Sequence, residues 1–479
     1  MRVVHLTLIA LVMATGSLPA VAGAQSQSER RVPLQPVHYD LELRPDYEAE
    51  QLFARVRLTV RNASEQTTPE LPLLLYRLMH VTSLADEQGN TLPFTQRVLT
   101  YEDWAKFQAN YVEVALPEPL APGEETTVTL EYEGHLLGYT ETGMLYTKDR
   151  IDPAFTIIRM DVNAYPRIGY PSLMANRAAG LPNYTFRAAV TVPESLQVAN
   201  LHRLVERSAA EGTATYVYES LEPSWRMDFA IAKYEVLEEQ GLTLFYFPED
   251  AEGAARVMDA FAASLELYAE WFGPLRRQGR FTVIEIPDGW GSQADATGAI
   301  QAAAAFQDAT ASREAYHEVS HFWNVGSKDR HFSRWDEGLA SFLEYLTLDH
   351  LEGDSVLAPR MEQRLGWVRT RFERQQLWRE TPMIRYQEVN ITGLSYTVGS
   401  LMFNVLYDVV GQERFNRIIG GFYQTYADQG ATTDEFVAYA KGVGGGDLDA
   451  LFQDWLYTTR WYDYVSAGEA MDELAARYR

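Results

Sequence analysis

The sequence contains no cysteine and has far fewer basic than acidic residues. Because none of its 479 residues is Cys, the chain can be neither cross-linked by disulfides nor anchored through a diacylglyceryl-cysteine. A chain of this length can bury a core large enough to fold without disulfides. With 41 Lys and Arg against 66 Asp and Glu, its formal charge is −25. This charge argues against nucleic acid and anionic membranes as partners, because both bind basic surfaces. It favours solubility and is compatible with cationic peptides as partners.

Long apolar runs are also missing. An apolar stretch near the N-terminus, residues 6–13, follows Arg2 and precedes small residues that end at Ala24. The stretch is too short and too interrupted to span a membrane. The pattern is typical of a secretory signal peptide, so we expect cleavage after residues 1–24, with an uncleaved anchor as the alternative. We therefore expect a secreted or periplasmic bacterial protein whose mature chain has no integral membrane span.

Two of the nine histidines form an HExxH pattern at residues 317–321. Residues four apart lie on one face of a helix, so His317 and His321 can bind one metal ion, and Glu318 reaches the open side of that ion. Ser312 is placed to cap the start of this helix. Two imidazoles and a carboxylate suit zinc and leave one position for water. The pattern therefore predicts a zinc site that supports hydrolysis.

A third protein ligand must come from another segment. Glu337 opens a second predicted helix, residues 335–346, whose apolar residues face inward and leave this carboxylate on the polar side. Glu344 lies two turns further along the same side, and His331 lies in the intervening loop. We prefer Glu337 as the ligand and interpret the other two as groups that support the ligands or face solvent.

The HExxH pattern followed by WDEGLASFLEYL at residues 335–346 resembles the gluzincins of the M1 aminopeptidase family. The resemblance covers most of the chain. It implies an aminopeptidase N-like metallopeptidase with one zinc ion bound by His317, His321 and Glu337, and with Glu318 as general base and acid. Fifteen residues separate His321 from Glu337, about three fewer than is usual in the family, and the shorter loop would reshape one wall of the cleft.

The resemblance also implies a group that stabilises the oxyanion. Tyr396, at the start of the stretch Tyr396-Thr397-Val398-Gly399, matches the family's Y-x-x-G motif, whose tyrosine hydroxyl has this role. Val398 stands where the family commonly has lysine. Only fourteen residues follow Val465. We therefore expect a short form without the large helical C-terminal domain of bigger family members.

Recognition of a free amino terminus is where the resemblance weakens. Family aminopeptidases carry a G-A-M-E-N strand whose glutamate binds the amine, a fixed distance after a Pro-Asp pair. Counted without a gap from Pro287-Asp288, the strand corresponds to residues 292–296, and Asp295 takes the place of the glutamate. A gapped match to residues 298–302 would instead lose the carboxylate. We prefer the first register, in which a shorter acid binds the amine less well.

The hydrophobic pattern divides the chain into an all-β part and a mainly helical part. Period-two alternation predominates to about residue 236 and resembles the β-saddle domain that opens M1 proteins. A strand-helix-strand order then leads into the HExxH helix, as in thermolysin-like catalytic domains. We therefore predict an α+β multidomain fold, with an all-β saddle or sandwich domain before a thermolysin-like catalytic domain. The predicted divisions are residues 25–236, residues 237–355 with HExxH, and the helical residues 356–479.

These features predict a zinc metallopeptidase that acts on a peptide or protein substrate. An aminopeptidase is favoured over an endopeptidase, because Asp295 keeps a carboxylate at the amine site. A different class, a metal-binding but idle peptide-binding or chaperone-like protein, stays open, although such a protein has no need of Glu318 as a general base. Hydrolysis of a non-peptide substrate is a third alternative. The oligomeric state cannot be predicted from these patterns.

Overall fold

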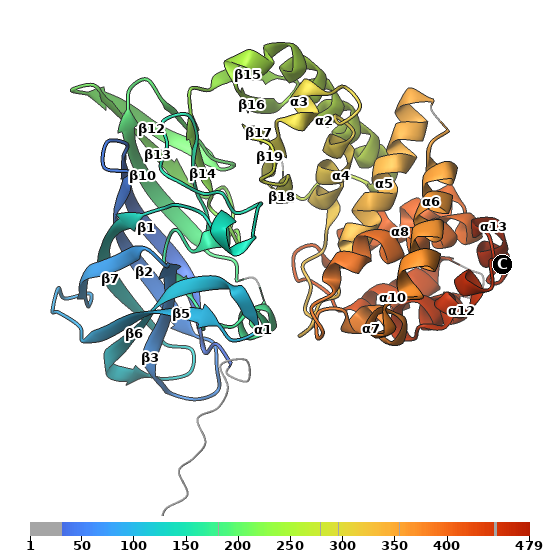
Figure 1. Cartoon of the computed structure of the whole chain (residues 1–479), viewed down its shortest axis with the longest axis horizontal. Coiled ribbons are helices and arrows are strands. Elements are labelled where there is room, and N and C mark those ends of the chain that lie inside the picture. The colour runs from blue at the N-terminus through green and yellow to red at the C-terminus, as the bar shows by residue number, and fades with distance from the viewer. Residues whose placement is uncertain (1–30, 181, 278, 296, 354, 445–447) are drawn as a thin grey trace, which may run out of the picture.

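The computed structural model describes residues 31–479 except 181, 278, 296, 354 and 445–447. The predicted signal peptide, residues 1–24, lies outside the described residues. In Figure 1 the strands of residues 34–232 form one half of the molecule, and the helices of residues 335–476 form the other. The predicted α+β multidomain fold is thus confirmed. Across the described parts of the chain, no helix is long and apolar enough to cross a membrane.

A seven-stranded sheet is the largest element of the β half. Its strands alternate between core and solvent: Leu41 and Leu43 are buried on either side of exposed Glu42. The two central strands β1 and β10 pair in parallel, and the other neighbours are antiparallel. The order is β12 (Arg203–Ala210), β13 (Thr213–Glu219), β10 (Thr185–Pro193), β1 (Leu34–Asp46), β2 (Gln51–Asn62), β7 (Glu125–His135) and β4 (Met79–Ala85).

A four-stranded sheet packs against this large sheet. Leu73 and Val112 of the smaller sheet share one core with Leu41 and Leu58 of the larger. The two sheets therefore form the sandwich that the period-two alternation predicts. The order is β5 (Phe94–Tyr101), β6 (Trp104–Leu120), β3 (Thr68–Tyr76) and β9 (Arg167–Ile168).

A three-stranded sheet packs against the five-stranded sheet that precedes the HExxH helix. Ile157 and Ala230 pack in one cluster with Ile284 and Ile300 of the following sheet and with Trp290 of the loop after β17 (Phe281–Ile286). The order is β11 (Gln197–Ala199), β14 (Phe229–Ala232) and β8 (Thr156–Ile158).

Two ion pairs are buried at this junction between the halves. Arg159 donates two hydrogen bonds to Asp149, at 2.7 and 3.0 Å, and Arg226 pairs with Asp228. The guanidinium of Arg159 also lies 5.3 Å from the ring centroid of Trp290. Pairing and hydrogen bonding offset the cost of taking these charges out of water.

A mixed five-stranded sheet follows, and helix α2 (Ala251–Phe272) connects its parallel strands β16 and β17. Phe261 of this helix packs on Val283 of the sheet. The first strand begins at Glu235, two residues before the boundary that we predicted at residue 237. The order is β15 (Glu235–Glu239), β16 (Leu242–Tyr246), β17 (Phe281–Ile286), β19 (Gly298–Ala302) and the edge strand β18 (Gln293–Asp295).

Helices build the remainder, and two of them cross at a pair of glycines. A Cβ atom at Gly338 would lie only 2.5 Å from the Cα atom of Gly399, so helices α5 and α8 touch backbone to backbone (Figure 1). This crossing sets the position of one helix relative to the other. The helices after the HExxH segment are α5 (Trp335–Glu352), α6 (Leu357–Phe372), α7 (Gln376–Glu380), α8 (Ser395–Val410), α9 (Gln412–Tyr426), α10 (Thr433–Gly444), α11 (Leu448–Phe452), α12 (Arg460–Ser466) and α13 (Met471–Ala476).

Candidate metal centre

The HExxH segment forms helix α4 (Glu314–Ser320), which continues as the 3-10 turn η5 (His321–Trp323). The predicted cap at Ser312 is wrong, because its hydroxyl donates to the carbonyl of Ala309 at 2.6 Å. The N-cap position is instead Arg313, and no side chain caps the helix there. Val319 packs into the core with helix α2, and this contact leaves the histidine side of α4 turned toward α5.

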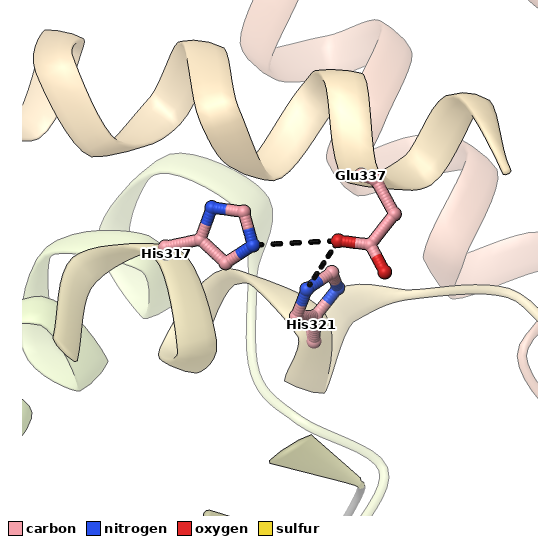
Figure 2. Close-up of side chains that lie close together, drawn as sticks. All are labelled: His317, His321 and Glu337. Carbon is pink, nitrogen blue, oxygen red and sulfur yellow. Dashed lines mark ion pairs between the residues drawn. The ribbon is translucent and has the colours of Figure 1, made fainter. Parts of the chain in front are cut away.

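His317, His321 and Glu337 converge on one point. In Figure 2 both imidazoles rise from α4 and η5 toward a carboxylate that descends from α5. The Nε2 atom of each histidine lies 3.4 Å from Oε2 of Glu337, and the three ligand atoms lie within 4.8 Å of one another. Ligands about 2.0–2.1 Å from a tetrahedral zinc ion lie about 3.3–3.4 Å apart. The donor types and their spacing therefore fit one zinc ion.

The two rival ligands take other positions. Glu344 accepts a hydrogen bond from Arg313 at 3.1 Å, and its second oxygen lies 3.9 Å from Nδ1 of His317. It therefore faces the side of the imidazole away from Glu337, where a carboxylate orients a metal-binding ring. His331 is outside the group of three. Within the part of the chain that the structure describes, the buried Nδ1 atom of His331 has no hydrogen-bond partner.

The environment of His317 favours its neutral form. Burial, together with the charge of His321, lowers the pKa of His317 well below its ordinary value. A neutral imidazole is the form that binds a metal ion. The side-chain nitrogen of Asn324 lies 2.8 Å from Nδ1 of His321, so this amide contacts the ring on the face away from Glu337.

Arg334 is a site residue that the sequence did not reveal. Its guanidinium pairs with Oε1 of Glu337, the carboxylate oxygen that does not face the histidines. Its guanidinium carbon also lies 6.0 Å from the ring centroid of Tyr396. The backbone of Arg334 is left-handed, with φ of 61°, and no residue pattern in the sequence signals this conformation.

Glu318 follows His317 in helix α4, and Tyr396 of α8 stacks beside His317. Glu318 is only 6% exposed, and burial raises its pKa to about 7. The ring of Tyr396 is parallel to that of His317, with an interplanar angle of 3° and centroids 6.1 Å apart. Burial raises the pKa of Tyr396, while the charge of Arg334 acts to lower it and the charge of Glu318 to raise it. The Tyr396 ring therefore lies beside the histidine that opens the HExxH segment.

Asp295 lies on the edge strand β18, opposite Gly298 of β19. Its side chain is 7% exposed and is held by protein donors. One carboxylate oxygen accepts hydrogen bonds from the backbone nitrogen and the hydroxyl of Thr297, at 2.6 and 2.5 Å. The other accepts from Ser224 of the β half, at 3.1 Å. The gapped alternative, Gly298–Ala302, forms the inner strand β19 instead.

Three comparisons place the chain among known proteins. No family model matches it. Glutamyl aminopeptidase from Homo sapiens is 23% identical over 465 residues, which cover 88% of this chain and 46% of that protein. Glutamyl aminopeptidase from Rattus norvegicus is 22% identical and is covered to 47%. The chain thus spans about half the length of the curated relatives that it matches.

Solved structures match over nearly their whole length. A point mutant of an M1 zinc metallopeptidase from Deinococcus radiodurans superposes with a TM-score of 0.64 at 19% identity, over 88% of this chain and 94% of that one. The same mutant bound to a Tyr-Ser-Ala substrate gives a TM-score of 0.63. The resemblance seen in the HExxH segment and in residues 335–346 therefore extends to the architecture. The chain has the fold of the M1 zinc metallopeptidases.

Proposed function

We propose that this protein is a zinc-dependent metallopeptidase that hydrolyses peptide bonds as an aminopeptidase. The observation that carries the proposal is the convergence of His317, His321 and Glu337, with 3.4 Å between each Nε2 and the shared Oε2. The sequence likeness to glutamyl aminopeptidases supports the same reaction class. The substrate is then a peptide or a protein.

The side chains around the ligands divide the chemistry of hydrolysis. A zinc ion bound by the three ligands would polarise a water molecule and the scissile carbonyl. Glu318 takes the proton of the attacking water and passes it to the leaving amine. The hydroxyl of Tyr396 donates a hydrogen bond to the oxygen on which negative charge develops. Glu344 and Asn324 lie near the Nδ1 atoms of His317 and His321, at 3.9 and 2.8 Å, on the side of each imidazole away from Glu337.

Asp295 is proposed to bind the free amino terminus, and its contacts favour a second candidate activity. Three donors from Thr297 and Ser224 already occupy this carboxylate. A carboxylate that already accepts three hydrogen bonds has few lone pairs left to accept one from an ammonium group. An endopeptidase, which needs no amino-terminal anchor, is therefore the second candidate. The two activities differ in whether a blocked N-terminus abolishes cleavage.

The test compares zinc-loaded wild-type protein with Glu318→Gln on two kinds of substrate. Amino-acid amidomethylcoumarins report exopeptidase activity, and an internally quenched peptide, with free or acetylated N-terminus, reports both activities. We expect release that a chelator abolishes and that Glu318→Gln lowers by at least about a hundred-fold. Glu413→Gln is the matched control, because it removes an exposed carboxylate of α9.

The outcomes separate the candidate functions. Cleavage of free but not acetylated peptide supports the aminopeptidase, and equal cleavage of both supports the endopeptidase. If zinc binds and no peptide is cleaved, the peptidase proposal fails in favour of an idle peptide-binding protein. Residues 1–24 are also proposed to direct export to the periplasm or the medium, which cell fractionation of the full-length chain would check.

A further inference from the structure

Glu314 lies one helical turn before the proposed general base on helix α4. It is four residues ahead of Glu318, so the two side chains share one face of the helix, with their Cβ atoms about 5–6 Å apart. Val319 occupies a different face, which packs into the core. Glu314 itself is half-buried. A second carboxylate therefore stands next to the general base, and no step of the proposed hydrolysis uses it.

The contacts of Glu314 fix one of its carboxylate oxygens at the start of strand β18. Oε2 accepts hydrogen bonds from the hydroxyl of Ser292 at 3.2 Å and from Nε2 of Gln301 at 3.1 Å. The Ser292 hydroxyl in turn accepts from Nε2 of Gln301 at 2.9 Å and from the backbone nitrogen of Ala302 at 3.1 Å. Gln301 is fully buried in the sheet, so this network is anchored in the core and orients the carboxylate.

The other carboxylate oxygen of Glu314, Oε1, is available to a ligand. Within the described parts of the chain, no hydrogen bond or ion pair reaches it. The neighbouring Arg313 pairs instead with Glu344, at 3.1 Å. The two donors at Oε2, from Ser292 and Gln301, are uncharged, so they orient the carboxylate without cancelling its charge. An oriented and partly exposed carboxylate of this kind is suited to bind a cationic group.

The order of groups along β18 indicates which part of a bound peptide comes near Glu314. Strand β18 is at the edge of its sheet, where an extended peptide can lie alongside. Ser292 precedes this strand and Asp295 ends it, about 10 Å away at 3.3 Å per residue. Helix α4 begins beside Ser292, and both α4 and η5 lie against β18 (Figure 1). Because Asp295 is the proposed position of the substrate's amino terminus and Glu318 acts at the scissile bond, Glu314 lies beyond that bond, on the side of the leaving amine.

We propose that Glu314 binds the basic side chain of the residue that follows the scissile bond in the substrate. A lysine or arginine side chain is long enough to cover the one helical turn, about 5.4 Å, that separates Glu314 from Glu318. Its ammonium or guanidinium group donates to Oε1, while Ser292 and Gln301 keep Oε2. The net charge of −25 also favours the approach of cationic peptides. The inference rests on the proposed peptidase function and adds a preference for one class of residue after the cleaved bond.

The experiment measures KM and kcat for zinc-loaded wild type, Glu314→Gln and Glu314→Asp on Ala-Arg-Ala and Ala-citrulline-Ala. Citrulline has nearly the shape of arginine and no charge, so the ratio of the two kcat/KM values isolates the effect of the charge. An internally quenched, acetylated peptide with arginine or citrulline at one position covers the endopeptidase candidate, and mass spectrometry identifies the cleaved bond. Titration calorimetry of the same peptides on the Glu318→Gln protein, with and without Glu314→Gln, measures binding without turnover.

We expect wild type to prefer arginine over citrulline after the cleaved bond by about three- to thirty-fold in kcat/KM, mainly through KM. Glu314→Gln should lose this preference, because the amide keeps the shape of the side chain but not its charge. Glu314→Asp should keep only part of it, because the charge stays on a shorter side chain. Glu413→Gln, which removes an exposed carboxylate of α9, should leave the ratio unchanged. A purely structural role of Glu314 would change the values for both peptides alike and leave the ratio at its wild-type value.

Equal kcat/KM values for the arginine and citrulline peptides in wild type, with equal affinities in calorimetry, would overturn the proposal. So would a preference that survives in Glu314→Gln. Failure of the peptidase function looks different: no peptide is cleaved, yet calorimetry still shows tighter binding of the arginine peptide that depends on Glu314. If Glu314→Gln does not fold, the wild-type ratio and its decrease in Glu314→Asp decide the matter by the same criteria.

Discussion

The close crossing of α5 and α8 leads to a prediction that links packing to the metal centre. Replacing Gly338 by alanine places a Cβ atom 2.5 Å from Cα of Gly399 and 2.7 Å from the carbonyl oxygen of Ser395. Carbon atoms pack best at about 3.5–4.0 Å, so the helices must separate by about 1 Å. Because the obstacles are backbone atoms, no side-chain rotation relieves the overlap.

The free-energy cost of this separation can be judged from substitutions that overpack other protein cores. Strain of about 1–3 kcal/mol is expected, and it outweighs the gain of about 0.5–1 kcal/mol from removing a helical glycine. The same shift displaces Glu337 on α5 relative to Tyr396 on α8. A displacement of about 1 Å between catalytic groups lowers turnover on the order of a hundred-fold. Gly338→Ala should therefore be less stable and much less active than wild type.

Urea unfolding followed by circular dichroism and kcat/KM on a fluorogenic peptide measure the two effects. Gly366→Ala in α6 is the control, because a Cβ atom there meets nothing within 4 Å, and it should gain about 0.5–1 kcal/mol. Gly399→Ala should fall between, since its Cβ atom meets one atom at 2.9 Å and the next at 3.6 Å. Wild-type stability and activity in Gly338→Ala would refute the view that this contact positions the site.

Three further predictions concern buried charge and the metal. Burial raises the pKa of Glu285 to about 9 from 4.5, so the folded protein holds a proton that the unfolded chain releases, and its stability falls as pH rises through this window. Glu285→Gln should therefore gain up to about 3 kcal/mol over wild type at pH 8 and nothing below pH 4.5 in urea titrations. Asp149→Ala leaves Arg159 buried without its bidentate partner and should lower the free energy of unfolding by about 3–5 kcal/mol. Glu413→Ala, at an exposed position of α9, should lower it by less than about 0.5 kcal/mol in the same assay. Chelation should lower Tm and added zinc restore it, whereas an unchanged Tm would mean that the centre holds no metal.

Local patterns in the sequence predicted much of the fold. Period-two alternation marked the strands of the β sandwich, because a strand with one buried face must alternate. Helical spacing placed His317 and His321 on one face, and the same reasoning put Glu337 in the first turn of the next helix. The structure brings all three together, while their role as ligands stays a prediction. These inferences succeeded because each depends on neighbours within one or two helical turns.

Features that depend on distant partners were not predictable in this way. Arg177 and Asn390 are 213 residues apart, and nothing near either residue signals their hydrogen bond. The carboxylate of Asp295 was expected to be free for an amine, but Ser224, 71 residues earlier, donates to it. Ser312 was expected to cap a helix, but its hydroxyl bonds backward to Ala309. In each case the local pattern did not determine which hydrogen-bond partner a polar group would have.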